Sequence, residues 1–151
     1  MGLTNMVTSN TLRWGGLSIG STVLVDSAPW IYVLEGRPRF AEKFTGLFEA
    51  ASRQELRLAL STITLSEILA GPYKNGQTAL AKRYEKALAS YLVVEISAPI
   101  AVLAAQLRAR FALKLPDAIQ VATALDMGAD ALVTHDRDFS KVRGLSVLMG
   151  D

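Results

Sequence analysis

Four acidic residues stand out because each lies at the end of an apolar run or shortly after one. Asp26 follows "TVLV", Glu67 stands in "STITLSEILAGPY", Asp117 in "LPDAIQVATAL" and Asp136 just after "ALVTH". An ionised carboxylate among apolar neighbours costs free energy unless it is paired. Two such charges about 4 Å apart repel by about 4 kcal/mol at an effective dielectric of 20. If the fold gathers these acids, we expect a cation to neutralise them.

The remaining residue types indicate which cation this would be. The chain has no cysteine and one histidine, so nearly all available ligands are hard oxygens. Such a ligand set selects Mg²⁺ or Mn²⁺ rather than zinc or copper. Mg²⁺ typically takes one or two carboxylates, several waters and a substrate phosphate. The chemistry this predicts is hydrolysis of a phosphodiester by a water that the metal activates.

Each acid also has a simpler interpretation as a local structural residue. Asp26 and Asp117 could cap helices that begin beside nearby prolines. Glu67 completes "TLSE", the pattern of a capping box, and Asp136 with Asp138 could form a turn. Caps and turns accept serine or asparagine equally well. Acids at all four positions therefore favour a shared site over four separate caps.

The elements that would position these acids alternate along the chain. Apolar runs predict strands at 22–25, 56–62, 91–97, 130–134 and 145–149. Helical periodicity predicts helices from 29 onward and at 39–52, 77–90, 99–113 and 117–127. Alternating strands and helices indicate a parallel sheet with helices on both faces. The carboxyl ends of its strands meet at one edge, where the four acids would converge.

The bulk composition sets further limits. The chain of 151 residues fits one domain, and half of it is hydrophobic. A net charge of +2 means that nucleic-acid binding would need a local basic patch. The lack of cysteine suits a reducing cytoplasm, and no run is long and apolar enough to span a membrane. Residues 1–20 show no clear period and suggest a loose extension.

Four segments together resemble a known family. In order and spacing, "VLVDSAPWIYVLEG", "STITLSEILAG", "LPDAIQVATAL" and "DALVTHDRDFSKVRGL" resemble the motifs of PIN-domain ribonucleases, especially VapC-type toxins of toxin–antitoxin pairs. The resemblance covers residues 22–149. It implies a Rossmann-like α/β/α sandwich with a central, mostly parallel sheet of about five strands. Residues 21–151 would form this nuclease domain, with 1–20 an N-terminal extension of uncertain role.

The resemblance also implies an activity and its residues. It implies an endoribonuclease dependent on Mg²⁺ or Mn²⁺, with Asp26, Glu67, Asp117 and Asp136 as catalytic acids. Of these, Asp26, Asp117 and Asp136 would bind the metal, directly or through water. Glu67 would assist through a water or orient the attacking one.

Further residues have supporting roles in this interpretation. The resemblance aligns Ser27 and Thr134 with positions that hold waters or hydrogen bonds to the ligands. Asp138 and His135 are secondary candidates, because the former resembles a structural residue and the latter a turn residue.

Partners follow from the same resemblance. We expect an RNA substrate, a cognate antitoxin, and a homodimer that forms a heterotetramer or larger assembly with the antitoxin in the cytoplasm. The apolar segment 29–52 would offer a groove to an antitoxin helix. Trp30 and Tyr32 either stack on bases or pack against neighbouring helices. Candidate phosphate contacts are Arg37, Arg39, Lys43, Lys74, Lys82, Arg83, Lys86 and Lys141.

Three alternatives remain open at this stage. The chain could be a PIN-like RNA-processing nuclease without an antitoxin. It could be a receiver-like switch that binds Mg²⁺, although no acid neighbours Asp26 and Lys141 lies well past its strand. It could also be a catalytically silent binding module of the same fold.

Overall fold

A parallel sheet forms the centre of the protein. The computed structural model describes residues 10–150 and arranges five strands in the order β3-β2-β1-β4-β5, with every neighbouring pair parallel. The strands are β1 (Ser21–Val25), β2 (Leu56–Ser61), β3 (Leu92–Val94), β4 (Ala131–Val133) and β5 (Val147–Leu148). This confirms the predicted α/β fold class, and the predicted strands differ from these mainly by being longer.

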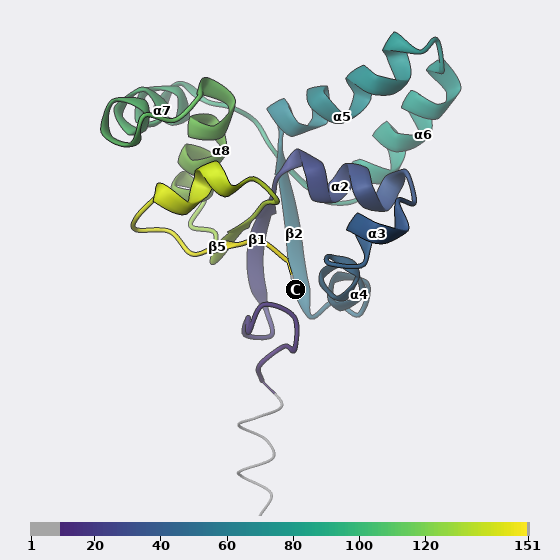
Figure 1. The fold of residues 1–151 in the computed structure, drawn as a ribbon, viewed down its shortest axis with the longest axis horizontal. Coiled ribbons are helices and arrows are strands. Elements are labelled where there is room, and N and C mark those ends of the chain that lie inside the picture. The colour runs from purple at the N-terminus through teal and green to yellow at the C-terminus, as the bar shows by residue number, and fades with distance from the viewer. Residues whose placement is uncertain (1–9, 151) are drawn as a thin grey trace, which may run out of the picture.

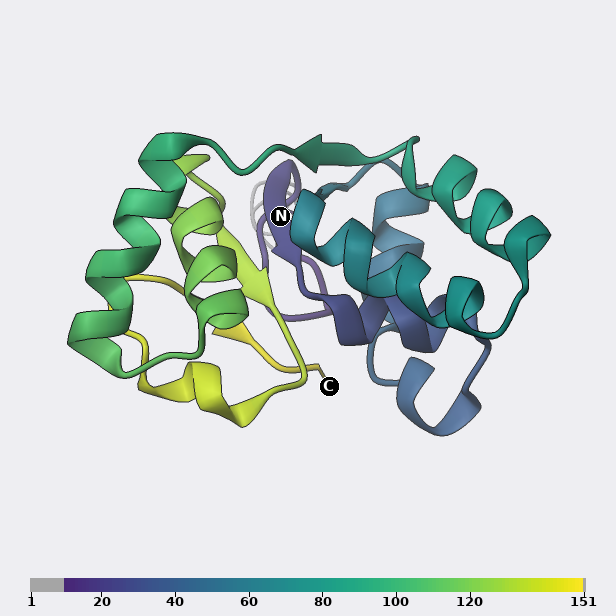
Figure 2. The ribbon, with the colours of Figure 1, turned by 90° about the horizontal axis from the view of Figure 1, so that it is seen from above.

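Helices cover both faces of this sheet. Figures 1 and 2 show α7 and α8 on one side and α2 to α6 on the other. The helices are α2 (Ser27–Leu34), α3 (Pro38–Ala41), α4 (Thr45–Ser52), α5 (Thr62–Lys74), α6 (Thr78–Leu88), α7 (Ala98–Phe111) and α8 (Leu115–Asp126), followed by a 3-10 helix, η1 (Arg137–Lys141). Within the described residues, every helix is too short or too polar to cross a membrane.

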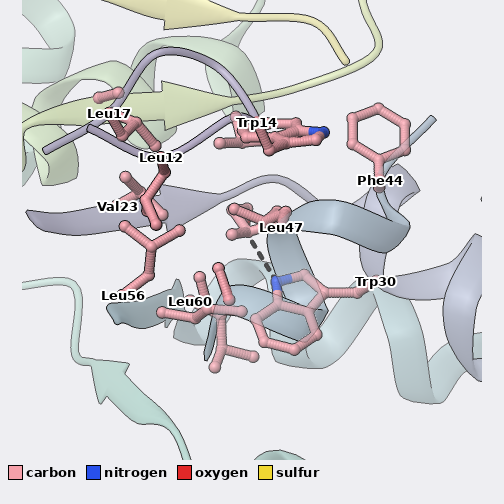
Figure 3. Close-up of a cluster of buried hydrophobic side chains, with 14 of the residues drawn as sticks. Leu12, Trp14, Leu17, Val23, Trp30, Phe44, Leu47, Leu56 and Leu60 are labelled. Carbon is pink, nitrogen blue, oxygen red and sulfur yellow. Dashed lines mark hydrogen bonds between the residues drawn. The ribbon is translucent and has the colours of Figure 1, made fainter. Parts of the chain in front are cut away.

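The central strand β1 separates two hydrophobic cores. Val23 and Val25 point into the core with α2, α4, α5 and α6, which includes Trp30 (Figure 3). Leu24, between them, points into the core with α7, α8 and η1. Successive side chains of a strand face opposite sides of the sheet. Burial on both sides explains why β1 reads as an uninterrupted apolar run.

The segment before β1 packs onto the first core. Thr11 and Ser18 form an antiparallel bridge, and Leu12 and Trp14 are buried. The Trp14 indole Nε1 donates to the Lys43 carbonyl at 2.9 Å. This part of the chain is therefore not a loose extension. Residues 1–9 lie outside the described residues, and the division into domains at residue 21 stays a prediction.

Some helix predictions were wrong in detail. The helix expected from Asp117 begins at Leu115 with Lys114 as its N-cap, so Asp117 lies in the first turn and is not the cap. The helix expected over 39–52 is split into α3 and α4 by residues 42–44. Lys43 lies in this break, and its carbonyl accepts the hydrogen bond from Trp14, a residue 29 positions earlier in the chain. The first helix begins at Ser27, two residues before the expected Pro29, because Asp26 already caps it.

Candidate functional site

An open cleft lies at the carboxyl ends of the strands. Its volume is about 370 Å³, and residues from β1–α2, α5, α8 and the segment after β4 line it. The lining residues are Asp26, Ser27, Ala28, Tyr32, Glu67, Pro116, Asp117, Gln120, His135, Asp136 and Arg137. All four acids predicted from the sequence are among them. The topology thus brings together residues that are far apart in the chain.

Asp26 is held at the end of β1 by several donors. Its Oδ1 accepts from the Ser27 backbone N–H at 2.8 Å and from the Gln120 amide Nε2 at 2.9 Å. Its Oδ2 accepts from the Thr134 hydroxyl at 2.9 Å. Asp26 is also the N-cap of α2, so its structural and site interpretations hold together. These bonds fix the carboxylate orientation within the cleft.

Gln120 and Arg137 line this site and were not predicted from the sequence, and Gln120 has the more extensive contacts. It is buried on α8, and its amide connects three elements. Besides binding Asp26, its Nε2 donates to the Thr64 hydroxyl at 2.5 Å, and its Oε1 accepts from the Ser61 hydroxyl at 2.8 Å. A sequence signal existed, because Gln120 follows Asp117 by three residues and shares its helix face.

The closest group of carboxylates comes from α8 and η1. One oxygen each from Asp117, Asp136 and Asp138 lies within 4.8 Å of the other two. Asp138, a secondary candidate from the sequence, thus joins the cluster. Asp26 lines the same cleft but is not in this closest group, so its role as a metal ligand stays a prediction.

The surroundings of Asp117 disfavour its charged form. Burial raises the pKa of Asp117 to about 6, and the carboxylates of Asp136 and Asp26 add to the rise. Its Oδ2 is buried without a hydrogen-bond partner among the described residues. Crowded carboxylates with an unpaired buried oxygen are a donor set that suits a divalent cation. The residues of the cleft therefore fit Mg²⁺ or Mn²⁺.

Asp136 and Thr134 connect this cluster to β4. The Thr134 hydroxyl accepts from the Asp136 backbone N–H at 3.0 Å while it donates to Asp26. Asp136 is the N-cap of η1 and accepts from the Asp138 backbone N–H at 2.9 Å. The turn expected from "HDRD" therefore forms, and it directs acids into the cleft.

Glu67 approaches the cleft from α5. It is exposed in the body of that helix, and its Oε1 accepts from the Ser27 hydroxyl at 2.7 Å. The capping-box interpretation of "TLSE" is wrong, because α5 begins earlier. Ser61 is the N-cap there, and its hydroxyl accepts from the Thr64 backbone N–H at 3.2 Å.

An aromatic group lies on the α2 side of the cleft. The Tyr32 hydroxyl and the His135 Nδ1 are 2.9 Å apart and hydrogen-bonded. Phe40 stacks on Tyr32, and Phe44 packs edge-on against His135. Trp30 is buried in the core, as one of the two sequence interpretations held. Tyr32, in contrast, reaches the cleft.

These observations define the class of the protein: an α/β sandwich with an acidic cleft at the carboxyl edge of a parallel sheet. The model of the PIN domain matches residues 23–145. The chain therefore belongs to the PIN-domain family, and the resemblance predicted from the sequence is confirmed. Among curated protein sequences, none matches the chain significantly.

Solved structures agree with this assignment. A toxin–antitoxin complex from Klebsiella pneumoniae has 32% identity and a TM-score of 0.66, covering 82% of this chain and 94% of its own. VapBC2 from Rickettsia felis, bound to a promoter DNA fragment, has 19% identity and a TM-score of 0.70 over 86% of this chain and 99% of its own. VapC20 of Mycobacterium tuberculosis, a toxin that cleaves the sarcin–ricin loop, has 15% identity and a TM-score of 0.64 over 78% and 92%. The last two comparisons concern the fold alone.

Proposed function

We propose that this protein is a divalent-metal-dependent endoribonuclease and the toxin of a toxin–antitoxin pair. Membership of the PIN-domain family and the similarity to toxin–antitoxin structures support a nuclease toxin. The observation that carries the finer proposal is the acidic cluster of Asp117, Asp136 and Asp138, in which Asp117 has a buried oxygen without a partner. Repulsion of this kind is relieved by a cation.

Asp117, Asp136 and Asp138 would hold the cation, with Asp26 beside them. When bound, Mg²⁺ or Mn²⁺ would activate a water and stabilise the negative charge that develops on a phosphodiester during hydrolysis. The protein's part is to keep the carboxylates in place before the substrate arrives. Gln120 and Thr134 do this for Asp26, each through a hydrogen bond of 2.9 Å.

Glu67 is suited to orient a water. Its Oε1 is occupied by the Ser27 hydroxyl, which fixes the direction of the carboxylate. The other oxygen, Oε2, is free to accept a hydrogen from a water in the cleft, because a carboxylate has about four acceptor sites. Arg137 lines the same cleft and supplies a positive charge for the RNA backbone.

The proposed partners follow the similar structures, several of which are toxin–antitoxin complexes. We propose a cognate antitoxin, a homodimer that assembles further with it, and the cytoplasm as the location. Trp30, Phe44 and Leu47, which the sequence suggested for an antitoxin groove over 29–52, are buried in the core. Val33 and Phe40 are the exposed large apolar side chains of this segment, and we propose that an antitoxin helix would contact them.

The test is cleavage of a panel of tRNAs and ribosomal RNA loops with Mg²⁺ or Mn²⁺. We expect Asp26→Asn and Asp117→Asn to lose at least about 100-fold in rate while the fold stays intact, the scale of losing a main electrostatic stabiliser. Asp126→Asn is the matched control, since Asp126 ends the same helix as Asp117 but is exposed and outside the cleft. Cleavage without metal, or cleavage indifferent to both site variants, would contradict the proposal.

A further inference from the structure

We propose that Tyr32 and His135 form a nucleobase subsite, an aromatic wall on which an unstacked base of the RNA rests beside the phosphate to be cut. This inference deepens the proposed function and rests on it. From the sequence, base stacking was one of two interpretations of Tyr32, and His135 had no such role. The inference follows from where the two rings lie, how they are held and which of their atoms are left without a partner.

The wall and the acids share one cleft. Tyr32 comes from α2 and His135 follows β4, and both line the cleft with Asp26, Asp117 and Asp136. Both residues are half-buried and line the cleft, so each presents part of its surface to solvent. A phosphate placed at the acids would therefore carry its neighbouring nucleoside close to these rings.

The rings are held before any ligand arrives. Tyr32 and His135 are perpendicular, with centroids 5.5 Å apart at 84°, and hydrogen-bonded to each other. Behind them, Phe40 stacks on Tyr32 at 5.0 Å and 25°, and the buried Phe44 packs against His135 at 5.7 Å and 80°. A rigid aromatic surface loses little conformational entropy on binding, which favours it as a ligand platform.

His135 is not placed to hold the cation. Among the described residues, the acids that lie close enough together to hold a metal ion are Asp117, Asp136 and Asp138, and this imidazole is not part of that group. Its Nδ1 is already paired with the Tyr32 hydroxyl. Its Nε2 has no hydrogen bond within residues 10–150, so it is the polar atom left to contact a ligand. A half-exposed ring with one unpaired nitrogen suits the edge of a base.

A nucleobase also suits the wall better than a phosphate does. Arg137 and the cation site provide for the negatively charged backbone, whereas Tyr32 and its Phe40 support are uncharged. RNA-binding proteins hold single-stranded bases by stacking them on aromatic rings, and base edges add hydrogen bonds. Since every base has a flat face, this mode predicts binding of all four bases with moderate preferences.

The single histidine of the chain makes the test specific. In untagged protein with Mg²⁺, the imidazole C–H signals of His135 are followed by NMR while nucleoside 5′-monophosphates are added. Ribose 5-phosphate, which has the same phosphate but no base, is the matched ligand. We expect nucleotides to shift the signals saturably. Their half-saturating concentration should be at least about five-fold lower than that of ribose 5-phosphate, which is the fold-change that one stacked base supplies.

Variants separate stacking from simple packing. Tyr32→Leu should weaken nucleotide binding by about five- to 100-fold, whereas Tyr32→Phe keeps the stack and should lose only a few-fold. Tyr73→Phe is the control, since Tyr73 is an exposed tyrosine outside the cleft. For ribose 5-phosphate, none of these changes should alter the affinity.

The outcomes distinguish this inference from the proposed function. Equal responses to nucleotides and ribose 5-phosphate would overturn the subsite even if RNA is cleaved. No response to any nucleotide would also overturn it and would leave the wall to a protein partner. Base-dependent binding that Tyr32→Leu weakens would support the subsite even if no RNA in the panel is cleaved, in which case the proposed function alone would fail.

Discussion

Replacing Gln120 with glutamate tests whether this residue holds Asp26. The Gln120 Nε2 donates to Asp26 Oδ1 at 2.9 Å and to the Thr64 hydroxyl. Glutamate has nearly the same shape, but it places an oxygen where that donor stood. Two carboxylates would then face each other across the contact, inside a buried network that includes Ser61. The change is therefore electrostatic rather than steric.

The distance sets the size of the effect. Two unit charges 2.9 Å apart repel by about 6 kcal/mol at an effective dielectric of 20. That is about four pKa units, so the pair shares one proton at neutral pH in the folded state. The unfolded chain, with a glutamate pKa of about 4.3, would release it. Folding then binds a proton, and stability falls by about 1.4 kcal/mol for each pH unit between about pH 5 and 8.

Urea unfolding of Gln120→Glu and native protein, followed by fluorescence of Trp14 and Trp30 in EDTA, measures this directly. At pH 7 the free energy of unfolding of Gln120→Glu should be about 4 kcal/mol lower than at low pH. Near pH 4 the variant should lose little stability beyond the hydrogen bond to Thr64. Gln120→Met removes the hydrogen bonds without adding charge, so its loss should not vary with pH. A stability difference between Gln120→Glu and native protein that stays constant from about pH 5 to 8 would refute the reasoning.

Two further predictions concern stability. Trp14→Ala should lower the free energy of unfolding by about 3–5 kcal/mol, as for other buried tryptophans. Ile19 lies in the same segment but is 45% exposed, so Ile19→Ala should lower it by only about 0.5 kcal/mol. Equal losses in urea unfolding would contradict the packing of this segment. Asp117→Asn should stabilise the metal-free protein above pH 6, because its raised pKa of about 6 penalises the folded carboxylate there and the penalty fades as pH falls toward 4. The free energy of unfolding should rise by about 1–2 kcal/mol, once solvent screening of this partly exposed group is allowed for. Urea unfolding at a series of pH values measures this change. A variant less stable than native protein at pH 8 would contradict the prediction.

The fold could be predicted from the sequence because its signals are local and repeated. Apolar runs and helical periodicity alternate, and parallel pairing follows from that order. The break between α3 and α4 could not be predicted, because Lys43 there accepts a hydrogen bond from Trp14, 29 residues earlier. The packing of Leu12 and Trp14 was missed for a related reason: a segment without periodicity gives no indication of which of its side chains are buried.

The site was predictable in its acids but not in its supporting residues. Asp26, Glu67, Asp117 and Asp136 were noticeable because charge is rare in apolar runs, and all four reach one cleft. An uncharged amide such as Gln120 gives no comparable signal, and its value depends on hydroxyls brought close only by folding. Which carboxylates form the closest group, Asp117, Asp136 and Asp138 without Asp26, likewise depends on distances that spacing along the chain does not specify.

The aromatic wall shows the same limit. Sequence reasoning offered Tyr32 either as a base-stacking residue or as a packing residue; the structure shows the packing, and base stacking stays a prediction. The ring packs on Phe40, and Tyr32 also lines the cleft. Its hydrogen bond to His135 joins residues 103 positions apart, which no local pattern indicates.

The central claim is that the carboxylates of this cleft bind a divalent cation, and Mn²⁺ binding followed by EPR tests it most directly. Native protein should bind Mn²⁺, and Mg²⁺ should compete. Asp117→Asn should weaken the affinity at least about ten-fold, as loss of one charged ligand from a small oxygen site does, whereas Asp126→Asn should not change it. Equal Mn²⁺ affinity in native protein and Asp117→Asn would contradict the account.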